Sequence, residues 1–446
     1  MKSYFCSTLL FFSFLVLWEF GIGGKNFFLI KQKLYQYRSL RAMKELYYLQ
    51  HLQLGQAPAN WNIPKEAFFT QPLDHFSRQT NATYNQRYWV NPDFWNSPNG
   101  PVFLHIGGEA ALSEYSALAG EHVELAEKYG ALVVSVEHRY YGASINLDGL
   151  TDKNIRFLSS QQALADLAAF HFHIVQQYNL TRNNTWICFG GSYPGSLSAW
   201  FRLKFPHLVY AAVASSAPVR AEMDFTGYNK VVSQSLSDPV VGGSPKCRRA
   251  TAEAFHIVEQ MVNDGKFAQL TEDYMACEQL TSEDCAEFVS DLADIFMGAV
   301  QYNKEAPTYN IAKFCNIMSN KSLGTTYSRL IVAVKQYMED MSLHCMDYSY
   351  KKSLADLRNT TFSPVGVGLR QWYYQTCTEF GYYQTCEDES CPFSRLMTLE
   401  AQLDICSKVF GIDPKSVEQA VKFTNEYYGA DHPKSSRIIF VNGTLI

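Results

Sequence analysis

Short apolar segments alternate with helix-like segments between residues 102 and 215, and this order constrains the fold more than any other feature of the chain. The runs with the length and composition of buried strands are 102–106, 131–136, 185–189 and 209–215. The segments between them with helical character are 119–129, 160–178 and 193–205. Strands that are apolar on both faces and alternate with helices indicate a parallel sheet covered on each side. We therefore predict an α/β fold.

The strand pattern stops after residue 221, which ends the first part of a sheet domain that we place at 61–221. Residues 222–369 show helical signals, carry many of the cysteines, and contain no run typical of a buried strand. We predict a helical cap there, inserted into the sheet domain. An apolar run reappears at 437–441, so residues 370–446 are expected to return to the sheet.

The first 24 residues are typical of a secretory signal peptide. Lys2 is followed by an apolar stretch from Tyr4 to Trp18 and then by small residues. The stretch is shorter than the ~20 apolar residues that a spanning helix needs, although a signal anchor remains an alternative. We expect no stable membrane span after cleavage, and an N-terminal extension over 25–60. Within it, Ser39 to Gln53 has the pattern of a short amphipathic helix.

Cysteines and glycosylation sequons also indicate export. Once Cys6 leaves with the signal, nine of the remaining ten cysteines lie between residues 247 and 406, in spacings that fit no zinc site. We predict disulfides, with Cys188 as a free core thiol and at least one further cysteine that is unpaired or pairs elsewhere. The glycosylation candidates are Asn81, Asn179, Asn183, Asn320 and Asn359, with a further sequon at Asn442.

Charge excludes one class of partner. The formal net charge is −5 and there is no run of lysine and arginine, so nucleic acid is not expected as a partner. We also expect no metal and no cofactor.

Residues 190–195, Gly-Gly-Ser-Tyr-Pro-Gly, are the strongest chemical signal. They follow a predicted strand and open a predicted helix, as the nucleophile turn of a serine hydrolase requires. The G-x-S-x-G pattern is not strict, because Pro194 takes the place of the second glycine. Proline is well suited to the first helical turn, where its missing N–H has no partner to lose. An ordinary strand–helix turn is the alternative to a nucleophile at Ser192.

Two other strand ends could complete such a site. An acyl-transfer enzyme needs backbone N–H groups aimed at the developing oxyanion. We expect one from Tyr193 and another from Gly107 or Gly108, although these glycines could form a plain turn. Residues 137–142, Glu-His-Arg-Tyr-Tyr-Gly, indicate a packed polar network in which His138 has a structural role.

Together the motifs at 137–144, 190–193, 215–219 and 375–381 resemble the family of lysosomal Pro-Xaa carboxypeptidase and dipeptidyl peptidase II, over about Trp61 to Gly443. The resemblance implies an α/β-hydrolase fold with a helical cap and a serine exopeptidase that cleaves peptides next to proline in lysosomes or endosomes. It implies that Ser192 is the nucleophile and that Trp372 and Glu379 lie near the substrate pocket. A homodimer is a further expectation.

The chain departs from the family pattern at its last residues. The family continues the late strand as Asn-Gly-x-x-Asp-Pro-Trp, and that Asp orients the catalytic His. Asn442 and Gly443 match, but the Asp position falls on Ile446. We therefore expect the fold to lack its C-terminal part and this form to be catalytically impaired, since losing the carboxylate costs about 10⁴ in turnover and losing the base about 10⁶. The histidines after Ser192 are not expected to substitute: His207, His256, His344 and His432.

Two alternatives to a serine peptidase remain open at this point. One is a non-catalytic isoform that binds or regulates peptides through the same pocket. The other is an esterase or lipase built on the same fold, for which the nucleophile turn would be the main support.

Overall fold

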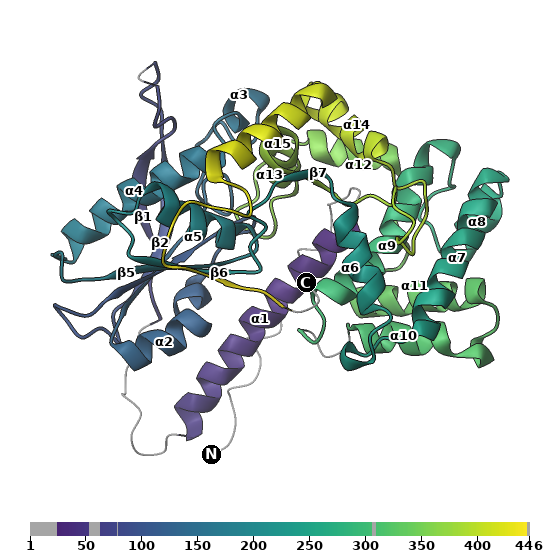
Figure 1. Cartoon of the computed structure of the whole chain (residues 1–446), viewed down its shortest axis with the longest axis horizontal. Helices are drawn as coiled ribbons and strands as arrows, with labels where there is room; N and C mark the ends of the chain where they lie inside the picture. Colours follow the sequence, from purple (N-terminus) through teal and green to yellow (C-terminus); the bar gives the residue numbers. More distant parts are fainter. Residues whose placement is uncertain (1–24, 53–62, 78, 306–308, 444–446) are drawn as a thin grey trace, which may run out of the picture.

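The computed structural model describes residues 25–52, 63–77, 79–305 and 309–443, so the predicted signal peptide lies outside the described residues. Figure 1 shows two lobes side by side, one built on a sheet and the other made of helices. We call them the sheet lobe and the helical lobe.

A seven-stranded sheet forms the sheet lobe, in the order β1-β2-β4-β3-β5-β6-β9. Its strands are β1 (Ala67–Pro72), β2 (Thr83–Asn91), β3 (Val102–Ile106), β4 (Leu132–Val136), β5 (Trp186–Gly191), β6 (Ala211–Ser215) and β9 (Ile438–Val441). β1 and β2 are antiparallel to their neighbours, and the strands from β4 to β9 are parallel to one another. The predicted buried runs are thus the central strands, and the mostly parallel sheet confirms the α/β-hydrolase fold.

Helices cover both faces of this sheet, as the apolar strands predicted. The main ones are α2 (Glu121–Tyr129), α4 (Ser160–Gln177) and α5 (Tyr193–Lys204), with the short α3 (Asp152–Ile155) nearby. Along β3, Val102 and Leu104 belong to the same buried cluster as α4 and α5, whereas Phe103 belongs to the cluster of α2. Successive strand residues point to opposite faces, so a strand between two helical layers is apolar at every position.

The helical lobe is formed by α6 (Thr226–Ser235), α7 (Pro245–Asn263), α8 (Phe267–Asp273), α9 (Cys285–Gln301), α10 (Ile311–Ser319) and α11 (Thr326–Met341). Six further elements connect the lobes: α12 (Tyr350–Arg358), α13 (Leu369–Gln375), α14 (Leu399–Phe410), α15 (Pro414–Tyr428) and the parallel pair β7 (Glu222–Asp224) and β8 (Gly381–Tyr383). Later residues also return to the helical lobe, because Cys386, Cys391, Phe393 and Met397 lie in its core. The boundary between the two lobes therefore does not fall at residue 370, because part of the chain beyond this residue packs in the helical lobe.

Four disulfides confirm the prediction from the cysteines. They are Cys247–Cys315, Cys277–Cys345, Cys377–Cys406 and Cys386–Cys391. Cys188 is a buried free thiol, as expected from its strand, and Cys285 is the further unpaired cysteine among the described residues.

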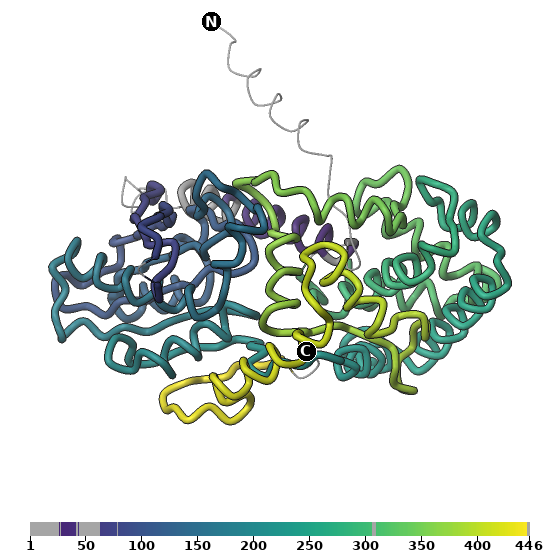
Figure 2. Tube along the Cα trace, turned by 90° about the horizontal axis from the view of Figure 1, so that it is seen from above, coloured from purple at the N-terminus to yellow at the C-terminus, as the bar shows by residue number. Residues whose placement is uncertain are grey.

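The N-terminal helix is longer than predicted and packs by a different part of its sequence. Helix α1 (Lys25–Leu52) begins well before Ser39 and runs between the two lobes (Figures 1 and 2). Ile30 and Leu34 are buried in the core of the helical lobe, whereas Leu40 and Met43 of the predicted apolar face are exposed. None of the helices in the described part of the chain has the length and apolar character to cross a bilayer.

Candidate active site

Ser192 occupies the turn between β5 and α5 in a strained backbone conformation, with φ at 64° and its side chain exposed. Its N–H donates to the Ser215 carbonyl at 2.9 Å. The turn is too tight for side chains on either flank: a Cβ at Gly190 would lie 2.2 Å from the Pro194 carbonyl oxygen, and one at Gly195 would lie 2.9 Å from the Ser215 oxygen. This is the geometry of a nucleophile elbow, where strain and a sharp turn present a serine at the edge of a sheet.

The loop after β3 packs against this elbow. The hydrogen bonds of this loop show which of its backbone N–H groups are free to act as oxyanion donors. A Cβ on Gly108 would lie 2.2 Å from Cγ of Pro194, so the backbone can approach only because Gly108 has no side chain. The N–H of Gly107 donates to the Val136 carbonyl at 2.8 Å, so Gly107 is unsuited as an oxyanion donor. The register of β3 with β4 thus leaves the N–H groups of Gly108 and Tyr193 as the candidates.

A buried polar network supports the elbow from behind. Nδ1 of His138 lies 2.7 Å from the Arg139 carbonyl, and Nε2 lies 2.9 Å from the Tyr193 hydroxyl. Because a carbonyl oxygen only accepts, Nδ1 carries the proton and Nε2 accepts from Tyr193. Burial lowers the pKa of His138 to about 4, so the ring is neutral at physiological pH. This agrees with the structural role expected for His138.

The two residues predicted near the substrate pocket, Trp372 and Glu379, lie in different places. Trp372, on α13, lines the cavity that contains Ser192. Glu379 is buried behind it, in a π-helical turn over Thr376–Phe380. Its carboxylate accepts from the Ser160 N–H at 2.9 Å and from the Ser160 hydroxyl at 2.6 Å. Burial raises the pKa of Glu379 to about 7, which these hydrogen bonds only partly oppose.

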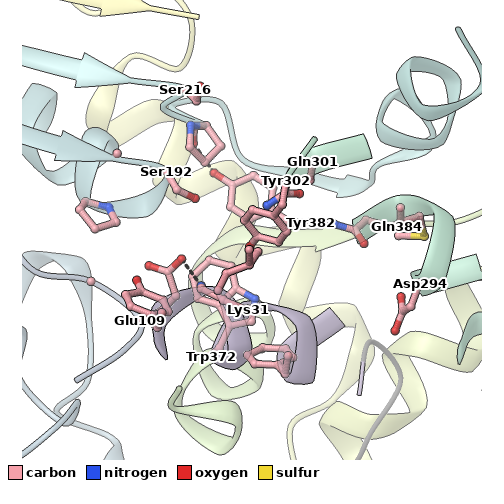
Figure 3. Close-up of a pocket in the computed structure, with 18 of the residues that line it drawn as sticks. Lys31, Glu109, Ser192, Ser216, Asp294, Gln301, Tyr302, Trp372, Tyr382 and Gln384 are labelled. Carbon is pink, nitrogen blue, oxygen red and sulfur yellow. Dashed lines mark hydrogen bonds and ion pairs between the residues drawn. The ribbon is translucent and has the colours of Figure 1, made fainter. Parts of the chain in front are cut away.

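Ser192 opens onto a cavity of about 1080 Å³ between the sheet lobe and the helical lobe. Figure 3 shows Trp372, Tyr382 and Tyr302 around it, contributed by three separate segments of the chain. Trp372 and Tyr382 stack with ring centroids 6.5 Å apart and an angle of 13° between their planes. Glu109 lines the same cavity beside the elbow. The cavity therefore combines an apolar aromatic wall with a carboxylate.

None of the four histidines after Ser192, all within the described residues, lines this cavity. His105 does line it, but its ring stacks on His122 with centroids 4.5 Å apart. Burial, together with His122, lowers the pKa of His105 well below its ordinary value. Within the described ranges, no group of acidic, histidine and cysteine side chains is arranged to hold a metal ion.

Sequence reasoning missed several residues of the cavity. Tyr302 and Tyr382 carry no local motif, because they reach the site only through the packing of the two lobes. Lys31, on α1, also lines the cavity, although it belongs to the segment expected to be an N-terminal extension. Glu109 had a usable signal, since it directly follows the two glycines of the oxyanion loop.

Comparison with known proteins decides what kind of enzyme carries this site. The family model described as serine carboxypeptidase S28 matches residues 71–445. The chain belongs to the serine carboxypeptidase S28 family. It is therefore a member of a family of serine peptidases, as its motifs predicted.

Relatives in the S28 family cover most of the chain. The human thymus-specific serine protease is 45% identical over 403 residues, which are 88% of this chain and 78% of that protein. The mouse thymus-specific serine protease is 45% identical over 398 residues, or 87% of this chain and 78% of the relative. The human lysosomal Pro-X carboxypeptidase is 27% identical over 394 residues, covering 85% and 76% respectively.

Proposed function

We propose that Ser192 is the nucleophile of a serine exopeptidase that binds peptides in the cavity between the lobes and cleaves next to proline. One observation carries the proposal. In a chain of the S28 family, an exposed serine with φ at 64° opens from a nucleophile elbow into a cavity large enough for a short peptide.

In the proposed reaction, Ser192 Oγ attacks the scissile carbonyl, the peptide C–N bond breaks, and the amine product leaves with a proton from the general base. Water then hydrolyses the acyl-enzyme, which releases the carboxylic acid product and restores the serine hydroxyl. The Tyr193 and Gly108 N–H groups stabilise the negative oxygen of the tetrahedral intermediate. The serine proton must pass to a general base, without which a serine hydroxyl is a weak nucleophile. Because the four histidines after Ser192 do not line the cavity, the proposal assigns this base to none of them.

The aromatic wall supports specificity for proline. A proline ring is compact and apolar, and it packs well against the flat faces of Trp372 and Tyr382. The Tyr382 hydroxyl donates to the Pro218 carbonyl, which fixes the orientation of the ring. The lysosomal Pro-X carboxypeptidases among the relatives are named for the same residue type.

Fluorophosphonate labelling tests the assignment of Ser192. Residues 1–446 are compared with a chain in which residues 444–446 are replaced by the corresponding C-terminal segment of the human thymus-specific serine protease. We expect the extended chain to label at Ser192 at least 100-fold faster and to hydrolyse proline-containing peptides, and we expect Ser192→Ala to abolish both. Hydrolysis that survives Ser192→Ala would overturn the proposal.

We also propose that the protein works in lysosomes or endosomes. Four disulfides indicate an oxidising compartment, and lysosomal Pro-X carboxypeptidases are among the relatives. The five glycosylation candidates are all exposed: Asn81, Asn179, Asn183, Asn320 and Asn359. Glycosidase digestion and co-localisation with a lysosomal marker test this proposal. The homodimer stays a prediction, and light scattering of the purified protein tests it.

A further inference from the structure

Helix α1 contributes a charged contact to the proposed peptide cavity beside Ser192. Lys31 Nζ lies 2.5 Å from Oε1 of Glu109, and both residues line the cavity with Ser192 (Figure 3). The side chains are largely buried, with exposed fractions of 13% for Lys31 and 8% for Glu109. A lysine of the N-terminal helix thus places its ammonium group where a substrate is proposed to bind.

We propose that Glu109 is a recognition residue for an alkylammonium group of the peptide, and that Lys31 occupies this subsite in the structure. The ammonium could come from the N-terminus of the peptide or from a lysine side chain. The inference rests on the proposed function for the identity of the ligand as a peptide, but its test requires no catalysis.

The position of Glu109 supports this role. It directly follows Gly108, whose backbone lies against Pro194 in the turn of the nucleophile. A peptide that places its scissile carbonyl at Ser192 and its oxyanion at Gly108 must pass Glu109 within a residue or two, since an extended chain advances ~3.3 Å per residue. The Glu109 carboxylate is therefore placed to bind a positively charged group of the peptide near the cleaved bond.

Electrostatics supply the reason for a cationic ligand. A carboxylate that is 92% shielded from solvent is costly unless a cation and hydrogen bonds compensate it. Arg38, another basic residue of α1 at the cavity, donates from Nε to Oε2 of Glu305 at 2.9 Å and so has its own carboxylate. Lys31 is the cation paired with Glu109, and a peptide ammonium can replace it with no change of charge.

Helix α1 is held by contacts that do not involve Lys31. Ile30 and Leu34 are in the core of the helical lobe, and Nδ2 of Asn26 donates to the Asp291 carbonyl at 3.0 Å. Lys31 can therefore be shortened while the helix stays in place. Lys33, two residues on, is a matched control because its ammonium donates to the Asp340 carbonyl and does not line the cavity.

Isothermal titration calorimetry of the full chain tests the proposal, with Ser192→Ala as the parent so that no peptide is cleaved. The probes are H-Ala-Pro-Ala-Ala amide, its N-acetylated form, and acetylated Ala-Pro-Lys-Ala and Ala-Pro-norleucine-Ala amides. We expect Lys31→Ala to bind an ammonium-bearing peptide at least tenfold more tightly than the parent, while Lys33→Ala equals the parent. Loss of the gain on acetylation assigns the N-terminal ammonium, and preference for lysine over norleucine assigns the side chain.

A second set of titrations removes the charge of Glu109. The Lys31→Ala, Glu109→Gln double variant leaves no unpaired charge, and we expect it to bind charged and neutral peptides equally. Equal binding of all four peptides by Lys31→Ala, or no binding by that variant while its melting temperature shows a folded protein, would overturn the inference. Failure of Ser192 to label with fluorophosphonate in the extended chain would contradict the proposed nucleophile but leave a Glu109-dependent preference intact.

Discussion

At the scale of single residues, the nucleophile depends on polar side chains that never reach the cavity. The Tyr193 hydroxyl donates to His138 and accepts from Nε2 of Gln375 at 3.1 Å. Gln375 in turn lies 3.3 Å from Glu379, which holds the Ser160 N–H and hydroxyl. A buried network whose members satisfy one another is rigid, so it fixes the residue next to Ser192.

The first prediction concerns the pH dependence of stability. Because the pKa of Glu379 is raised from 4.5 to about 7, the folded protein keeps a proton there that the unfolded chain releases above pH 4.5. The contribution of Glu379 to the free energy of unfolding is thus fully present below pH 4.5 and falls by about 3 kcal/mol as the pH rises through 7. Glu379→Gln keeps an acceptor for Ser160 and removes this fall.

Urea denaturation from pH 4.5 to 8 measures the effect. The stability of Glu379→Gln relative to the wild type should rise by about 3 kcal/mol across this range. Glu418→Gln, on the exposed face of α15, is the control and should follow the wild type at every pH. A constant difference between Glu379→Gln and the wild type would contradict the assignment.

The second prediction concerns the contact between the oxyanion loop and the elbow. Gly108→Ala places a Cβ 2.2 Å from the Pro194 ring, so the loop must move away from Ser192. We expect at least a tenfold loss of fluorophosphonate labelling in the extended chain, since one displaced oxyanion donor costs about 10²–10³ in turnover. Gly227→Ala, on α6, meets no atom closer than 3.7 Å and should label normally.

Spacing in the sequence was enough to predict Ser192 and the loop at Gly108, because a strand, a glycine turn and a helix follow one another directly. The exclusion of Gly107 depends on a hydrogen bond to the neighbouring strand, and no local pattern records which strand that is. Glu379 was assigned to the substrate pocket with Trp372. The π-helical turn, which the sequence does not reveal, directs its side chain toward Ser160.

At the scale of elements, the sheet was predictable and α1 was not. The four central strands are short runs that are apolar at nearly every position and alternate with helical segments, which is typical of buried parallel strands. Helix α1 buries Ile30 and Leu34 against a lobe that is encoded over 200 residues later. A helix whose apolar residues contact a distant partner gives a weak local signal, so the sequence pattern predicted an apolar face that includes the exposed Leu40 and Met43 and missed the buried pair.

The third prediction tests how closely α1 packs on α9. A Cβ on Gly298 would lie 2.5 Å from Cδ1 of Ile30, so the glycine admits the isoleucine. Gly298→Ala should lower the free energy of unfolding by about 1 kcal/mol, because overpacking costs about 1–3 kcal/mol and the gain in helix propensity offsets about 1. Ile30→Val removes the clashing methyl group.

A double-mutant cycle in urea isolates this contact. Adding Ile30→Val to Gly298→Ala should cost less than adding it to the wild type, for which about 0.5–1.5 kcal/mol is typical. Additive effects of the two substitutions would show that α1 does not pack on Gly298 in solution.

At the scale of the whole molecule, two long-range disulfides brace the helical lobe. Cys247–Cys315 and Cys277–Cys345 each join residues 68 positions apart. The composition predicted such bonds, but not their pairing, because nine cysteines in one region allow many connectivities and only the fold brings particular pairs together.

The fourth prediction follows from the length of these loops. Replacing Cys247 and Cys315 with serine should lower the free energy of unfolding by about 4 kcal/mol, the chain-entropy value for a loop of this size. Thermal unfolding under non-reducing conditions measures the loss. Cys285→Ser, at a free thiol, is the matched control and should change the stability little. An equal loss in both variants would contradict the role of the disulfide.

The position of α1 has a consequence for the biogenesis of the protein. Asn26 bonds to Asp291, 265 positions further along the chain, so α1 leaves the ribosome long before its packing partner has been synthesised. Strand β9 likewise joins β6, whose residues lie more than 200 positions earlier in the chain. Exposed apolar surface on a nascent chain invites association. We therefore expect the growing polypeptide to require chaperone protection until α9 and β9 have been synthesised, which pulse-labelling with chaperone pull-down can follow.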